Sequence, residues 1–172
     1  GAVVANPPDR CYHCKNTLFR QILRAAENDG FPVLLDGTNA SDDAGDRPGM
    51  RALRELSVRS PLRECGLTKA EIRRLSREAG LFTWDKPAYA CLATRIRTGE
   101  EITLQKLKQT EKAEGFLFGL GFRDFRVRMV GNTAKLELRE ADLPLLLENR
   151  EKIVTELRKD YDSVLLNLEV RK

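Results

Sequence analysis

Cys91 lies in a segment whose neighbouring residues favour a chemically active thiol. It follows Pro87, with Lys86 five residues before it and Arg95 four residues after it. Positive charges stabilise a thiolate, which is the form of cysteine that acts as a nucleophile or a metal ligand. The segment makes Cys91 a candidate catalytic residue, although a small buried side chain is the usual role of a free cysteine and stays open as an alternative.

A second thiol pair, Cys11 and Cys14, surrounds the single histidine of the chain, His13. Two cysteines at this spacing can hold a metal ion or an iron–sulfur cluster, or can form a redox pair. A structural zinc site normally needs two further ligands at their own short spacing, and no second CxxC occurs. A redox motif of the thioredoxin type would follow a strand, whereas Pro7 and Pro8 precede this pair.

Polar residues follow the short apolar run 31–35. This pattern predicts a buried parallel strand that delivers polar side chains at its carboxyl end, where open α/β sheets bind ligands. Acidic residues in the following loop, together with an arginine, could orient a magnesium-bound nucleotide. The candidates for this role are Asp36, Thr38, Asn39, Asp46 and Arg47. A solvated loop rich in turn residues is the alternative explanation.

Residues 125–129 alternate between apolar and other side chains, so Arg126 and Arg128 share one face of a predicted strand. Two arginines on the open face of a sheet would bind a phosphate or a carboxylate well. Alternating arginines can also simply keep one face of a sheet soluble, and this explanation remains open.

These candidates must be positioned by a mixed set of helices and strands. Helical spacing and end signals predict helices over 15–28, 50–56, 68–79, 104–120 and 143–159. Extended segments are expected at 31–35, 57–62, 93–97, 125–129, 134–138 and 163–169, with a hairpin turn at Gly131 and Asn132. From residue 93 the order is β-α-β-β-α-β, which matches a ferredoxin-like half-open sandwich. We place a domain boundary near Gly99.

Composition indicates a globular protein of one large or two small domains. The chain has 172 residues, of which 41% are hydrophobic, and no apolar run approaches the ~20 residues that a membrane span needs. No secretory signal is recognisable, so we expect a cytoplasmic protein. The net charge of +4 comes without a basic tail, and nucleic-acid binding is therefore not indicated. In a reducing compartment the four cysteines are expected to be ligands, nucleophiles or core residues rather than disulfides.

Several segments in serial order resemble the LarE family. They are NPPDRCYHCK at 6–15, DGTN at 36–39, DRPG at 46–49, SPL at 60–62, GLTK at 66–69, EIR at 71–73, DKP at 85–87 and ACL at 90–92. The family consists of ATP-dependent sulfur transferases that build the nickel-pincer nucleotide cofactor of lactate racemase. The resemblance covers most of the chain through Arg128, and its specificity lies in the order of the segments.

For the fold, the resemblance implies an α/β protein of the PP-loop ATP pyrophosphatase superfamily. Residues 1–98 would be the C-terminal part of a Rossmann-like domain related to the adenine nucleotide alpha hydrolases, and would carry the cysteine site. Residues 99–172 would be a small α+β, ferredoxin-like domain on the substrate side. The phosphate-binding Ser-Gly-Gly-x-Asp-Ser loop that opens such a domain is absent from the sequence, and the chain begins without Met. We therefore expect an N-terminal PP-loop segment to be missing.

For the activity, the resemblance implies adenylation of a carboxylate of a pyridinium-biscarboxylate mononucleotide, with ATP and Mg as co-substrate. A sulfur nucleophile would then attack the acyl adenylate. In some members the cysteine that matches Cys91 gives up its own sulfur. In members that also carry the CxxC, Cys11, Cys14 and Cys91 would hold a 4Fe-4S cluster with one iron free to carry an added sulfide. The resemblance also implies a homo-oligomer, and a sulfur donor protein is a candidate partner.

Four further residues match family positions near the substrate phosphate. These are Arg95, Glu114, Arg126 and Arg128. The sequence reads TRIRTG at 94–99, where the family usually has SRIPYG. Two other functions remain open. One is a tRNA-thiolating enzyme with the same adenylate and sulfur chemistry, and the other is a non-catalytic zinc- or cluster-binding module.

Overall fold

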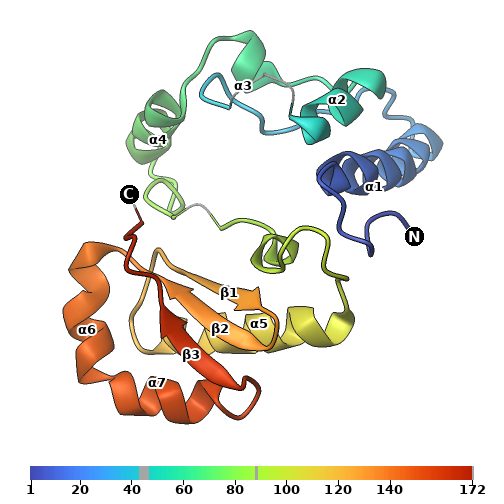
Figure 1. The fold of residues 1–172 in the computed structure, drawn as a ribbon. Coiled ribbons are helices and arrows are strands. Elements are labelled where there is room, and N and C mark those ends of the chain that lie inside the picture. The colour runs from blue at the N-terminus through green and yellow to red at the C-terminus, as the bar shows by residue number, and fades with distance from the viewer. Residues whose placement is uncertain (43–46, 88, 172) are drawn as a thin grey trace. The chain divides into compact units, whose positions relative to one another are not determined.

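The computed structural model describes residues 1–42, 47–87 and 89–171, which fold into two compact units. Unit 1 comprises Gly1–Val3 and Pro7–Lys86, and unit 2 comprises Val4–Asn6 and Pro87–Lys172. Figure 1 labels the elements of both units. The expected domain boundary near Gly99 stays a prediction, and the two units of the structure divide between Lys86 and Pro87.

Unit 1 is formed by helices and loops. Its helices are α1 (Arg10–Asn28), α2 (Pro48–Glu55), α3 (Pro61–Glu64) and α4 (Lys69–Glu78). The first two pack against each other (Figure 1), and the buried apolar side chains of this unit include Ala52, Leu53 and Val58. Helix α4 begins with a capping box, in which the Thr68 hydroxyl accepts from the amide of Glu71 and the Glu71 carboxylate accepts from the amide of Thr68.

Helix α1 begins earlier than the sequence pattern predicts. The amide of Tyr12 donates to the carbonyl of Asp9 at 2.8 Å, so the first turn closes directly after the proline pair. Asp9 occupies the N-cap position, and a proline just before a helix start does not disturb the helical hydrogen bonds. As a result Cys11 and Cys14 lie on the helix itself and not on the segment that leads into it.

The expectation of a buried strand at 31–35 is wrong. The segment makes only an isolated parallel bridge, Leu35 to Arg59, with hydrogen bonds on that one side. Phe31, Val33 and Leu35 are exposed by 68%, 56% and 56%. Strands of parallel sheets are buried because neighbouring strands and covering helices enclose them. No described residue supplies a second neighbouring strand here, which explains the exposure.

Unit 2 is a three-stranded sheet with helices packed on it. The strands β1 (Arg126–Val130), β2 (Thr133–Glu137) and β3 (Ser163–Leu166) lie in the order β1-β2-β3. The β1–β2 pair is antiparallel and forms the expected hairpin, with Gly131 at a φ of +57°, and β3 is parallel to β2. Its helices are η1 (Leu92–Arg95), α5 (Leu104–Gly119), η2 (Glu140–Asp142), α6 (Leu143–Glu148) and α7 (Arg150–Leu157).

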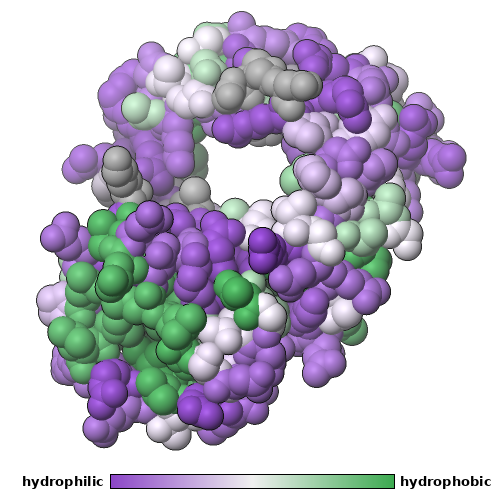
Figure 2. All heavy atoms as spheres, in the orientation of Figure 1, coloured by the Kyte–Doolittle hydropathy of each residue, from purple (hydrophilic) through white to green (hydrophobic). Residues whose placement is uncertain are grey.

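The core of unit 2 lies between the sheet and its helices. It includes Leu117 of α5, Val127 and Met129 of β1, Leu136 of β2 and Ile153 of α7. Outside the core, Leu147, Leu165 and Leu166 line an apolar groove. Figure 2 shows the corresponding hydrophobic surface over the sheet and α6.

Two expected elements of unit 2 differ from the structure. The strand predicted at 93–97 is a 3-10 helix, η1, followed by a single parallel bridge from Ile96 to Met129. The helix predicted at 143–159 is divided into α6 and α7 at Asn149, whose side-chain amide donates to the carbonyl of Leu145 at 3.0 Å.

The architecture contains helices and one small sheet, which agrees with the predicted α/β class. The Rossmann-like and ferredoxin-like assignments stay predictions. None of the helices in the described ranges combines the length and the apolar character that crossing a bilayer requires.

Candidate functional site

Glu114 is the centre of a buried polar network in unit 2. It lies on the buried face of α5 with Thr110, Ala113 and Leu117, as helical periodicity requires. Its Oε1 accepts from Arg95 Nε at 2.6 Å and from the amide of Val127 at 3.0 Å. Its Oε2 accepts from Arg95 Nη2 at 3.1 Å and from the hydroxyl of Tyr89 at 2.8 Å. Four donors therefore satisfy this carboxylate, and its role near the substrate phosphate stays a prediction.

Residues 89–95, called the Cys91 segment below, are joined to this network. Cys91 is exposed and occupies the N-cap position of η1. Its carbonyl accepts from the amide of Thr94 at 2.9 Å and from the Thr94 hydroxyl at 2.7 Å. The Thr94 hydroxyl in turn accepts from Arg95 Nη1 at 2.8 Å, and the Thr94 carbonyl accepts from Arg128 Nη1 at 2.7 Å. Exposure removes the simple buried-packing explanation for Cys91.

Three arginines, Arg126, Arg128 and Arg171, lie at the sheet of unit 2, and Arg95 lies close to Arg126. Arg126 is buried, and burial lowers its pKa, as do the neighbouring charges of Arg95 and Arg171. Arg128 is partly exposed, and its Nε donates to Glu137 Oε1 at 2.7 Å. Glu114 and Asp124 act in the opposite direction on the pKa of Arg126, and Arg126 and Arg171 share Asp124 as an acidic partner, so two guanidinium groups face one carboxylate. An anion such as a phosphate would relieve this excess of positive charge.

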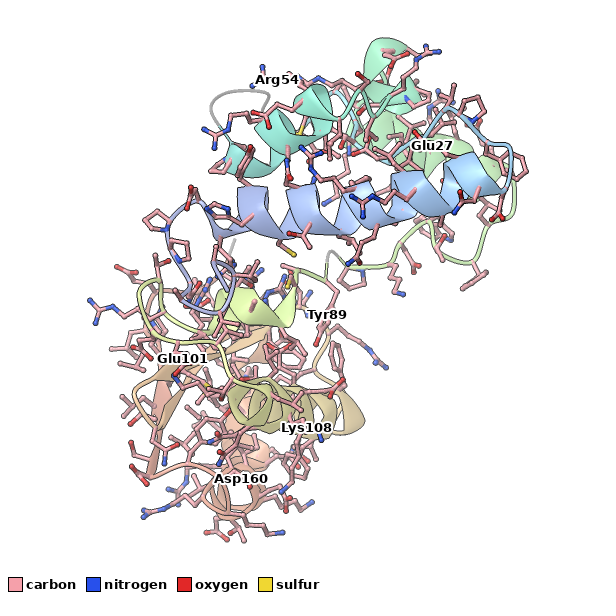
Figure 3. All side chains as sticks on the ribbon, turned by 90° about the vertical axis from the view of Figure 1, so that its right-hand side faces the viewer. Glu27, Arg54, Tyr89, Glu101, Lys108 and Asp160 are labelled. Carbon is pink, nitrogen blue, oxygen red and sulfur yellow. The ribbon has the colours of Figure 1, made fainter. Side chains whose placement is uncertain are left out.

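Arg171 and Tyr89 are residues that the sequence analysis missed. The amide of Arg171 donates to the carbonyl of Leu138 at 2.8 Å, and its Nη2 donates to Asp124 at 3.1 Å. It follows the last strand, where no periodic pattern marks it. Tyr89 lies beside α5 (Figure 3), and its ring contacts that of Phe118 at 5.9 Å. Burial and the Glu114 carboxylate raise the pKa of Tyr89 to about 12, so its hydroxyl remains a donor at neutral pH.

The thiol pair of unit 1 is open to solvent. Cys11 and Cys14 are both exposed, and Arg10 Nη2 lies 3.9 Å from Cys11 Sγ. His13 Nε2 lies 3.2 Å from Asp9 Oδ2, so the histidine has a carboxylate partner of its own. Two exposed cysteines at this spacing are free to bind a metal ion together.

The polar residues after 31–35 partly converge in unit 1. Asp36 accepts from the hydroxyls of Thr38 and Ser60, both at 2.6 Å. Burial alone would raise the pKa of Asp36, but these hydrogen bonds outweigh it and lower the pKa below its ordinary value. Ser60 is therefore a polar neighbour of Asp36 that the sequence analysis did not assign to this group. Its one signal in the sequence is the SPL segment at 60–62, within the second extended segment.

The other predicted nucleotide-binding residues lie further along the same loop. Asn39 Oδ1 accepts from the amide of Ser41 at 2.9 Å, which shapes the turn. Arg47 is exposed at the N-cap of α2. Asp46 lies outside the described residues. The structure thus brings Asp36 and Thr38 together with Ser60, while Asn39 serves the loop that follows.

The predicted cluster ligands fall in different units. Cys11 and Cys14 belong to unit 1, whereas Cys91 belongs to unit 2. Within the described ranges, no three cysteine, histidine, aspartate or glutamate side chains are grouped as a metal site. The donor chemistry nevertheless fits an iron–sulfur cluster, because all three thiols are free and exposed. The three-cysteine site stays a prediction.

Comparison with known proteins gives relatives but no family model that matches. An uncharacterised protein of Synechocystis is 43% identical over 134 residues, which are 78% of this chain and 50% of the relative. An uncharacterised protein of Methanocaldococcus jannaschii is 34% identical over 170 residues, or 98% of this chain and 66% of the relative.

A third relative carries a functional name. The pyridinium-3,5-bisthiocarboxylic acid mononucleotide synthase of Lactiplantibacillus plantarum is 33% identical over 153 residues, which are 89% of this chain and 55% of the synthase. The chain is thus similar to this synthase over most of its own length. The name of this relative says that it synthesises a pyridinium bisthiocarboxylic acid mononucleotide. The chain spans about half to two thirds of the length of these curated relatives.

Proposed function

We propose that the protein is an ATP-dependent sulfur transferase that converts a pyridinium-biscarboxylate mononucleotide into a thiocarboxylate. The observation that carries the proposal is the arrangement within unit 2. An exposed thiol at Cys91 is linked through Thr94 to Arg128, beside the positively charged group of Arg126 and Arg171. The name of the Lactiplantibacillus relative states a product of the same chemical class.

The arginines would bind the phosphate of the mononucleotide. Arg126 and Arg171 lie close enough for their charges to act on each other, and Arg128 is partly exposed at the same sheet. Guanidinium groups form paired hydrogen bonds with phosphate oxygens, which fixes orientation as well as position. Bound in this way, the mononucleotide would have its pyridinium ring held near the Cys91 segment.

Unit 1 would contribute to the ATP side of the reaction. Asp36 stays ionised at neutral pH, because the hydroxyls of Ser60 and Thr38 donate to it. A carboxylate with this support suits the second coordination sphere of a magnesium-bound nucleotide. In adenylation a carboxylate oxygen attacks the α-phosphate of ATP and displaces pyrophosphate. Sulfur can then attack the carbonyl carbon of the acyl adenylate, and AMP leaves with the former carboxylate oxygen.

Cys91 is the proposed sulfur nucleophile or sulfur ligand. Its thiol is exposed, while its backbone is fixed by the two bonds from Thr94. Cys11, Cys14 and Cys91 would be the residues that hold a 4Fe-4S cluster, which when bound would supply an iron site for an added sulfide. The sulfur donor protein and a homo-oligomeric assembly belong to the same proposal.

Pyrophosphate release by the full-length protein tests the proposal. ATP and magnesium are supplied with the pyridinium-biscarboxylate mononucleotide, with tRNA, or with neither. Release that depends on the mononucleotide supports the proposal, and release that depends on tRNA contradicts it. In a second step, sulfur incorporation is compared between Cys91→Ser and the matched exposed cysteine variant Cys65→Ser. We expect loss only in Cys91→Ser, and equal loss in both variants would count against a role for Cys91.

A further inference from the structure

Both flanks of Cys91 are bound to one buried carboxylate. Upstream, the Tyr89 hydroxyl donates to Glu114 Oε2 at 2.8 Å. Downstream, Arg95 donates to both oxygens of Glu114, at 2.6 and 3.1 Å. We infer that Tyr89 is a positioning residue whose hydrogen bond to Glu114 holds the Cys91 segment beside the arginines of unit 2.

The hydroxyl of Tyr89 forms the hydrogen bond that joins the upstream side of the Cys91 segment to Glu114. The residue is half exposed, so burial alone does not fix its position. Its ring makes a tilted contact with Phe118 at 5.9 Å, and the Arg95 guanidinium lies 5.5 Å from the ring centre. Phenylalanine can keep both ring contacts, but it cannot donate to Glu114. The hydroxyl can therefore be removed with little change in packing.

The downstream flank is fixed independently of Tyr89. Thr94 binds the Cys91 carbonyl, and Arg95 and Arg128 bind Thr94. Without the Tyr89 hydroxyl, the segment would lose its upstream hydrogen bond to Glu114. The thiol of Cys91 would then sample positions further from Arg126 and Arg128, while the buried pair of Arg95 and Glu114 would remain intact.

The inference rests on the proposed function only in one respect: sulfur transfer explains why the Cys91 thiol should be held close to a bound anion. The positioning itself can be measured without ATP, mononucleotide or metal. Iodoacetate and iodoacetamide alkylate the same thiol and are similar in size, but only iodoacetate is an anion. The ratio of their rates at one cysteine reports the local positive potential, because the thiolate fraction cancels in the ratio.

The experiment measures this ratio at Cys91 and at Cys65 in the full-length protein after chelator treatment, by mass spectrometry of peptides. Cys65 is the internal reference, since it is also exposed. In the wild type we expect the ratio at Cys91 to exceed that at Cys65 on the order of tenfold at low ionic strength, and less in salt. Tyr89→Phe should remove most of this excess. The matched control is Tyr12→Phe, because the Tyr12 hydroxyl donates to Glu55 of unit 1 at 2.7 Å.

The outcomes separate positioning from general structural damage. Loss of the excess in Tyr89→Phe, with wild-type ratios in Tyr12→Phe and at Cys65, supports the inference. An unchanged ratio at Cys91 in Tyr89→Phe overturns it, and so does an equal change in both variants. A protein that transfers no sulfur but shows the expected ratios would contradict the proposed function and leave the inference standing.

Discussion

Arg95 and Glu114 form a two-pronged ion pair in unit 2, in which both side chains are 1% exposed. The pair is nineteen residues apart in sequence and joins η1 to α5. Breaking a buried pair leaves one charge without its partner in a medium of low polarity. The pair therefore joins the downstream end of the Cys91 segment to α5, and its loss should reduce the stability of unit 2.

Glu114→Gln is expected to destabilise the protein by about 3–5 kcal/mol, because it leaves the Arg95 charge buried without its carboxylate. The measurement is urea unfolding followed by far-ultraviolet circular dichroism. Glu64→Gln is the matched control, because Glu64 pairs with Arg59 at an exposed position and should change stability little. Equal losses in the two variants would show that the buried position of Glu114 has no special importance.

Arg126→Gln should weaken binding of the mononucleotide by about tenfold or more, since a hydrogen bond to a charged group contributes about 1.5–3 kcal/mol. Isothermal titration calorimetry measures the change, and the affinity of the wild type should fall with salt. Arg150→Gln serves as the control, because Arg150 is exposed on α7. An unchanged affinity in Arg126→Gln would exclude this arginine from the anion site.

Ionisation of Tyr161 should lower the stability of unit 2 at alkaline pH. Burial raises the pKa of Tyr161 to about 12, while an unfolded tyrosine ionises near pH ~10. Its contribution is fully present below the unfolded pKa, and it is lost as the pH rises through the folded pKa. We therefore expect the stability of the wild type, relative to Tyr161→Phe, to fall by about 1–3 kcal/mol between pH ~10 and ~12.

Tyr161→Phe itself should change stability little at neutral pH. The Tyr161 hydroxyl is buried and forms no hydrogen bond within the described part of the chain. Removing an unpaired buried hydroxyl costs little. Denaturant titrations of both proteins across this pH range provide the measurement, and parallel curves would contradict the predicted dependence.

Anaerobic iron–sulfur reconstitution tests the predicted three-cysteine site. Cys11→Ser, Cys14→Ser and Cys91→Ser should each lose the charge-transfer absorption of the cluster, while Cys65→Ser should keep it. All four thiols are exposed, so access does not distinguish them. Zinc bound at one equivalent in place of iron, or full absorption in Cys91→Ser, would contradict the prediction.

Local patterns predicted the features of the fold that depend on neighbouring residues. The hairpin at Gly131, the capping box at Thr68 and the helical face of α5 all follow from turn chemistry or from a period of 3.6 residues. The strict alternation in β1 placed Arg126 and Arg128 on one face, but it did not show that Arg126 is buried and Arg128 is partly exposed.

Long-range contacts could not be predicted in this way. Tyr89 and Glu114 are twenty-five residues apart, and no periodicity connects a loop tyrosine to a helical glutamate. Arg171 reaches Asp124 from the end of the chain. The error at 31–35 has the same origin, because an apolar run indicates a strand without showing whether other strands cover it.

The most direct test of the account is the mass of the mononucleotide after incubation with the full-length protein, ATP, magnesium and a sulfide source. We predict a product in which sulfur has replaced a carboxylate oxygen, formed by the wild type and by Cys65→Ser but not by Cys91→Ser. An unaltered mononucleotide in the wild-type reaction, or the same product in Cys91→Ser, would contradict the account.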